Sequence, residues 1–223
     1  MRKSAFKLVA ILAVAVVPLS AQAELVSVVE DGDTSVLFGN GALASLGLGI
    51  AGVDDDTQVP GDLGPFSVAF DINDRDEVLP TSFSYQDGDF LGTFSGTIEH
   101  SGEVDLEILA TEQIVTVGDF TIGFDGSRVG GDRTGFFVLD NQDLGIILFD
   151  LANPIVEAFD VSLVIAADLL VSEELSNALG ADAAGVDAGM ALVVADASVV
   201  PVPAAAWLFG SALALLGWVR RRA

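Results

Sequence analysis

Cysteine is absent from the 223 residues, and histidine occurs once, as His100. The absence of cysteine excludes disulfide bonds, thiolate-ligated zinc or iron–sulfur centres and thiol catalysis, and one histidine excludes any site that needs two. Lysine occurs only at Lys3 and Lys7, so the segment from Glu24 to Asp196 combines all 33 acidic residues with only three arginines, for a net charge of −30. Such a body is repelled by phosphate backbones, which excludes nucleic-acid binding as a main role.

The first 23 residues have the three parts of a secretory signal peptide. A basic start precedes an apolar run over residues 8–17, Pro18 interrupts any helix, and Ala21 and Ala23 are small residues at the positions that a signal peptidase accepts. As a helix the run is about 15 Å long, too short for a hydrocarbon core of about 30 Å. We therefore expect export, with cleavage by signal peptidase after Ala23.

The other end of the chain holds a second apolar segment. Residues 197–219 carry no charged side chain, and three arginines follow them. Because Pro203 cannot lie inside a helix, we expect a transmembrane helix over residues 204–219, about 24 Å long, with the arginines on the cytoplasmic side.

This order of features resembles the C-terminal sorting signal of exosortase substrates, the PEP-CTERM family, in its VPLPA variant. A proline motif, an apolar helix and a basic end follow one another, and Val202 stands where the family usually has Leu. The resemblance implies that an exosortase in the inner membrane cuts near the proline motif and passes the body to the cell surface or extracellular matrix of a Gram-negative-type bacterium. The residues that carry the resemblance are Val200, Pro201, Val202, Pro203, Ala204, Ala205, Trp207, Arg220, Arg221 and Arg222.

Between the signal peptide (1–23) and the sorting signal (199–223), residues 24–198 have the size of one domain. Short alternating apolar and polar segments, separated by Gly, Asp and Asn turns, predict an all-β fold: an antiparallel β-sandwich of jelly-roll kind. One short helix and the C-terminal transmembrane helix complete the expected fold class. The expected strands are 25–30, 34–38, 66–72, 81–86, 90–99, 103–108, 113–125, 134–139, 144–150, 156–166 and 190–199.

Two local features are predicted in more detail. The alternation over 90–99 and 103–108 indicates a hairpin whose turn contains His100, so we expect this histidine to be exposed. Ser172, followed by two glutamates, predicts the start of the short helix, and Gly180 its end.

Acidic clusters in the expected loops are the candidates for metal binding. Calcium takes about six to eight oxygen ligands, and the best local candidate set is Asp71, Asn73, Asp74 and Asp76. This is not an EF-hand loop, because Arg75 occupies the third ligand position. The alternative is that the carboxylates form only a solvated surface that resists aggregation.

No catalytic group stands out. The chain has no Gly-x-Ser-x-Gly motif, and Asp168, the acid nearest to an isolated carboxyl in an apolar run, is equally explained by strand alternation. A glycoside hydrolase needs only two carboxylates and therefore stays open as a third hypothesis. Tyr85 is the only tyrosine, which lowers support for a carbohydrate platform without removing it.

We therefore expect a non-enzymatic envelope or matrix protein, exported and processed by signal peptidase and exosortase. Its body would have a structural or adhesive role in exopolysaccharide or biofilm. The alternative function is a calcium-dependent, lectin-like carbohydrate-binding module, and calcium is the only cofactor to which the sequence points.

Overall fold

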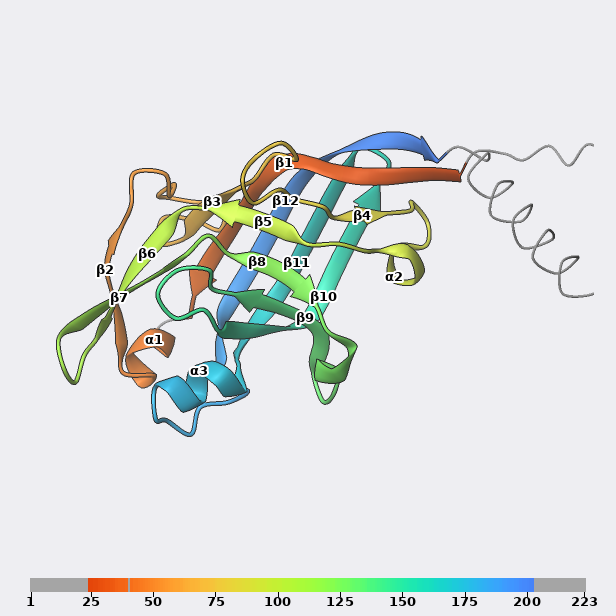
Figure 1. Cartoon of the computed structure of the whole chain (residues 1–223). Coiled ribbons are helices and arrows are strands. Elements are labelled where there is room, and N and C mark those ends of the chain that lie inside the picture. Colours follow the sequence, from red (N-terminus) through yellow and green to blue (C-terminus); the bar gives the residue numbers. More distant parts are fainter. Residues whose placement is uncertain (1–23, 40, 203–223) are drawn as a thin grey trace, which may run out of the picture. The chain divides into compact units, whose positions relative to one another are not determined.

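Strands make up most of the computed structural model, which describes residues 24–39 and 41–202 (Figure 1). The helices within these residues are short: α1 (Ala42–Ser45), α2 (Phe90–Thr93), α3 (Glu173–Ala178) and the 3-10 turn η1 (Gly126–Arg128). The strands are β1 (Glu24–Phe38), β2 (Leu48–Val53), β3 (Val68–Ile72), β4 (Ser84–Tyr85), β5 (Ile98–Ser101), β6 (Glu103–Ile108), β7 (Gln113–Gly118), β8 (Thr121–Phe124), β9 (Arg133–Leu139), β10 (Ile147–Phe159), β11 (Ser162–Val171) and β12 (Asp187–Val202).

The main sheet closes on itself. Its strand order is β12-β11-β10-β9-β8-β5-β3-β1-β4, and β1 also pairs with β12. Eight strands therefore form a closed antiparallel barrel, and β4 adds a ninth strand beside β1. The expected jelly-roll sandwich is wrong. Sandwiches and barrels both need strands with alternating inward apolar residues, so this pattern does not reveal whether the first and last strands pair.

Two glycines allow β1 and β12 to approach closely enough to close the barrel. A Cβ atom on Gly32 would overlap the carbonyl oxygen of Val194, and one on Gly189 would overlap that of Leu37. Their φ angles of +136° and +142° favour glycine. Because position 32 faces 194 and position 189 faces 37, the two strands run antiparallel, and Figure 1 shows the start of β1 beside the end of β12.

A second, three-stranded sheet extends from the barrel wall. Gly102, with a φ of +111°, separates β5 from β6, and Asp119, with a φ of +46°, separates β7 from β8. β6 pairs with both β2 and β7. The apolar side chains Leu48, Val104 and Val117 of this sheet are buried and join one core cluster with side chains of the barrel.

The expected hairpin between residues 90–99 and 103–108 is wrong. Residues Phe90–Thr93 form α2, and the chain continues from β5 through Gly102 into β6, whose hairpin partner is β7. His100 is consequently an inward residue of the barrel and only 1% exposed, not an exposed turn residue.

The alternation of β11 and the start of α3 follow the sequence pattern. Every second residue of β11 from Leu163 to Val171 is buried, and the residues between them are half-buried. The Ser172 Oγ accepts a hydrogen bond from the Leu175 backbone N–H at 2.9 Å, which confirms the predicted N-cap. Gly180, with a φ of +63°, follows the helix, as the sequence indicates.

The membrane-spanning helix of the expected fold class has no counterpart among the described helices. Within residues 24–39 and 41–202, none is long and apolar enough to cross a membrane. The segment 204–219, on which that expectation rested, lies outside the described residues. So do Ala21 and Ala23 of the expected signal cleavage site and the sorting-signal residues Pro203, Ala204, Ala205, Trp207, Arg220, Arg221 and Arg222.

Replacing Gly189 by Ala tests the barrel closure. The new methyl group would collide with the backbone of β1, whereas Gly64, with a φ of +110°, has open space around its Cβ position and serves as the control. We expect Gly64→Ala to lower the free energy of unfolding by about 1 to 3 kcal/mol through backbone strain alone. Gly189→Ala should cost at least about 2 kcal/mol more, because the strand must shift. Urea unfolding of both variants measures the difference, and equal losses would contradict a tight β1–β12 contact.

Candidate functional site

An apolar cleft with a volume of about 370 Å³ lies beside α2. Its walls come from α2 and from five barrel strands, β8 to β12. Thr134 is the one lining residue with a polar side chain, and its hydroxyl already donates to the Leu151 carbonyl oxygen at 2.8 Å. The cleft is therefore apolar throughout, and no titratable side chain lines it.

Three phenylalanines in mutual contact form one wall of the cleft. The ring centroid of Phe94 lies 5.0 Å from that of Phe124 and 4.9 Å from that of Phe136, and the last two are 5.2 Å apart. Phe90 packs against Phe94 at 5.6 Å. This interlocked packing holds the wall in one arrangement, so that the cleft is preformed.

The cleft is open to solvent. Leu91 is 77% exposed and Phe124 is 43% exposed. Large apolar side chains that line a concave surface and face water are typical of ligand and partner sites. The exposed positions therefore mark this cleft as the candidate functional site.

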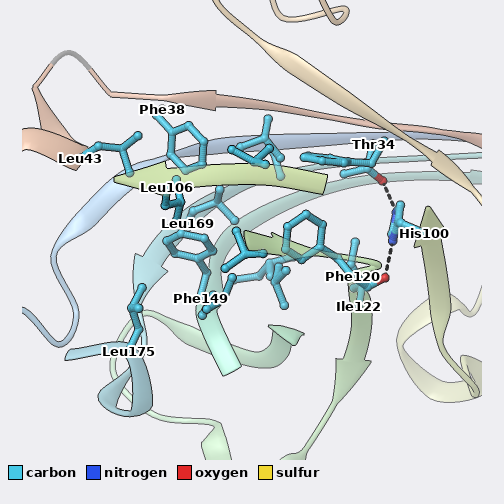
Figure 2. A pocket seen from close by; sticks show the side chains of 18 of the residues that line it. Thr34, Phe38, Leu43, His100, Leu106, Phe120, Ile122, Phe149, Leu169 and Leu175 are labelled. Carbon is cyan, nitrogen blue, oxygen red and sulfur yellow. Dashed lines mark hydrogen bonds between the residues drawn. The ribbon is translucent and has the colours of Figure 1, made fainter. Parts of the chain in front are cut away.

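A smaller cavity of about 50 Å³ lies within the barrel (Figure 2). Ile122 and Leu151 line both the cavity and the cleft, so the two spaces adjoin. In Figure 2, Leu43 of α1 and Leu175 of α3 lie at one end of the cavity and His100 at the other.

His100 is held in its neutral form at the end of this cavity. Its Nδ1 lies 2.9 Å from the Phe120 carbonyl oxygen, which can only accept, so Nδ1 carries the proton. The Nε2 atom, 2.7 Å from the Thr34 hydroxyl, then accepts a hydrogen bond from it (Figure 2). Burial lowers the pKa of His100 to about 4, and the bond to Phe120 opposes this shift only in part. With both ring nitrogens occupied, the histidine has a structural role.

Arg128 fixes a helix that lines one end of the cavity, α3. Its guanidinium pairs with Asp150 of β10, at 2.7 and 3.0 Å, and with Glu174 of α3, at 2.6 and 3.0 Å. Asp150 is buried, and the hydrogen bonds raise the pKa of Arg128 and lower that of Glu174. Because the next residue of α3, Leu175, lines the cavity, these ion pairs hold that end of the cavity in place.

The four calcium candidates do not converge on one point. Asp71 lies in β3 and accepts a hydrogen bond from Gln58 at 2.6 Å, whereas Asp74 and Asp76 are exposed in the following loop. The Asn73 side chain is buried, and its Nδ2 donates to the Leu79 carbonyl oxygen at 3.0 Å. Within residues 24–39 and 41–202, no group of three or more His, Asp or Glu side chains is arranged to hold a metal ion. Calcium binding here stays a prediction.

Part of the proline motif lies in the described chain. Val200, Pro201 and Val202 form the end of β12 and are extended. Val200 is 45% exposed, and Pro201 is also exposed.

The two residues considered for sugar chemistry are placed elsewhere than in the cleft. Tyr85 is fully buried, with its hydroxyl donating toward the carbonyl oxygens of Phe159 and Ser162 at 2.6 and 2.9 Å. Asp168 is half-buried on β11 and accepts a hydrogen bond from Asn153 at 2.9 Å.

The cleft itself was missed by sequence reasoning. Its residues come from six elements, and each strand contributes only one to three of them. The one available signal was Leu91, an apolar residue beside Phe90 that breaks strict alternation.

The pH dependence of stability tests the neutral state of His100. Because its folded pKa, about 4, lies below its ordinary value of 6.5, the unfolded chain binds one more proton between these pH values. The contribution of neutral His100 to the free energy of unfolding is complete above pH 6.5 and is lost as the pH falls towards 4. Relative to His100→Gln, we expect wild-type protein to lose about 3 kcal/mol over this window. Urea unfolding at several pH values measures the free energy of unfolding of both proteins. If this free energy changes equally with pH in both, His100 does not have the lowered pKa.

Comparison with known proteins does not assign this chain to a family. No protein-family model matches the chain, and no curated protein matches it significantly. Among solved structures, the chain is similar to the C-terminal domain of HtaA from Corynebacterium glutamicum, with a TM-score of 0.46 and 13% sequence identity over 76% of this chain and 99% of that one. A likeness this weak supports no functional inference, so the candidate site rests on its own geometry.

Proposed function

We propose that this chain is an exported surface protein whose barrel binds a small apolar molecule in the cleft beside α2. The observation that carries the binding proposal is the cleft itself, a preformed apolar concavity of about 370 Å³. Small-molecule sites typically have volumes of about 300 to 1,000 Å³ and are lined mainly by hydrophobic and aromatic side chains.

The exposed apolar wall supplies the driving force for binding. A ligand that covers Leu91 and Phe124 removes apolar surface from water, at about 25 cal/mol per Å². For a ligand of about ten heavy atoms, a dissociation constant on the order of 1 to 100 μM requires about 0.5 to 0.8 kcal/mol per atom, which lies within the range of about 0.3 to 1.5 kcal/mol per atom that small ligands reach. The rigid phenylalanine wall keeps the ordering cost of the protein low.

Binding has more support than catalysis. Among the cleft residues the only polar side chain is that of Thr134, and its hydroxyl is engaged with the main chain. General acid–base chemistry needs a titratable group within reach of the substrate. The carbohydrate-binding alternative also has less support, because Tyr85 is buried and the cleft offers no set of polar groups for sugar hydroxyls.

The surface location is the second part of the proposal. It is supported by the resemblance of the C-terminal residues to an exosortase sorting signal and of the first 23 residues to a signal peptide. The sorted body would stand in the exopolysaccharide or biofilm matrix. A structural or adhesive role there is the second candidate function, supported by the exposed loop carboxylates Asp55, Asp56, Asp74 and Asp76.

Leu91→Asn tests the cleft as a binding site. The variant places an amide on the cleft wall, and it should change the free energy of unfolding by no more than about 0.5 kcal/mol, because Leu91 is exposed. We expect the affinity of the whole chain for the neutral dye N-phenyl-1-naphthylamine to fall at least about threefold. Fluorescence titration measures this change.

Val78→Asn is the matched control, since Val78 is fully exposed and lies outside the cleft. It should leave dye affinity at the wild-type value. Equal dye binding by all three proteins, or equal losses in both variants, would contradict binding in this cleft.

A further inference from the structure

An open groove with two carboxylates adjoins the cleft. Phe90 and Leu91 of α2 line both the cleft and the groove, as do Pro154 and Val156 of β10. The groove adds Asp87 and Asp89 from the loop before α2, both of them exposed, so that the groove, unlike the cleft, is lined in part by carboxylates.

All charged side chains that line the cleft and the groove are negative. Asp87 and Asp89 are the only charged side chains among the residues that line the cleft or the groove. The three arginines of the described chain are engaged elsewhere: Arg128 and Arg133 contact Asp150, and Arg75 donates to a carbonyl oxygen of β1. An anionic group in the groove would therefore meet repulsion that none of these three arginines offsets.

We propose that the ligand of the cleft is an amphiphilic cation, with its apolar body in the cleft and its positively charged head beside Asp87 and Asp89. This rests on the proposed function and specifies the chemical class of ligand. The head stays in contact with water in the groove, so it keeps most of its hydration while the chain is buried. Its attraction to two carboxylates selects cationic over neutral and anionic heads of the same chain length.

Three ligands with one chain and different heads test the charge selection. Octylammonium, 1-octanol and octanoate are titrated into the whole chain by calorimetry at neutral pH and low salt. We expect octylammonium to bind about tenfold more tightly than octanol, and octanol about tenfold more tightly than octanoate. Sodium chloride at about 0.5 M should compress these differences, because it screens exposed charges.

Two double variants test whether Asp87 and Asp89 cause the preference for the cationic ligand. The double variant Asp87→Asn/Asp89→Asn should bring octylammonium close to the affinity of octanol, without changing octanol binding. The control Asp55→Asn/Asp56→Asn removes the same charge from two exposed residues of the β2–β3 loop and should keep the wild-type preference.

The outcomes separate this proposal from the one on which it rests. Equal binding of all three ligands, or equal loss of preference in both double variants, would overturn the cationic ligand and leave an apolar site standing. Binding of none of the three would overturn the proposed function itself.

Discussion

The backbone contact between β1 and β12 decides what this molecule can enclose. Gly32 and Gly189 let the two strands approach where any Cβ atom would collide with the opposite main chain. Once the strands pair, the sheet has eight strands in a closed circuit, and a barrel of this size is just wide enough to be filled by side chains or to hold one small ligand. In this chain, one part of the barrel is filled by side chains and another part leaves space for a ligand. Side chains nearly fill the part lined by Leu43 of α1 and Leu175 of α3, and the part beside α2 is left as a cleft.

The charge of the protein makes an open apolar cleft tolerable. Exposed apolar surface such as that of Leu91 and Phe124 promotes association between copies of a chain. A net charge of −24 opposes that association by mutual repulsion, while a small neutral or cationic molecule can still approach. The acidic composition that excluded nucleic acid thus also favours selective access to the cleft.

The sequence predicted features that depend on neighbouring residues. The period-two pattern of β11 and the cap at Ser172 are local, and both are present. Features that depend on distant pairs were missed: Gly32 and Gly189 look like ordinary turn glycines until β1 meets β12. The spacing of Phe90 and Phe94 suits a helical turn as well as a strand, which explains the misplaced hairpin and the unexpected burial of His100. The cleft was out of reach because six separate elements build it.

Intermolecular nuclear Overhauser effects would test the central claim most directly, by showing where a bound apolar chain lies. With 1-octanol bound to the whole chain, this account predicts contacts from its aliphatic protons to the ring protons of Phe94, Phe124 and Phe136. Contacts confined to other residues, under conditions where octanol is bound, would show that the cleft beside α2 is not the binding site.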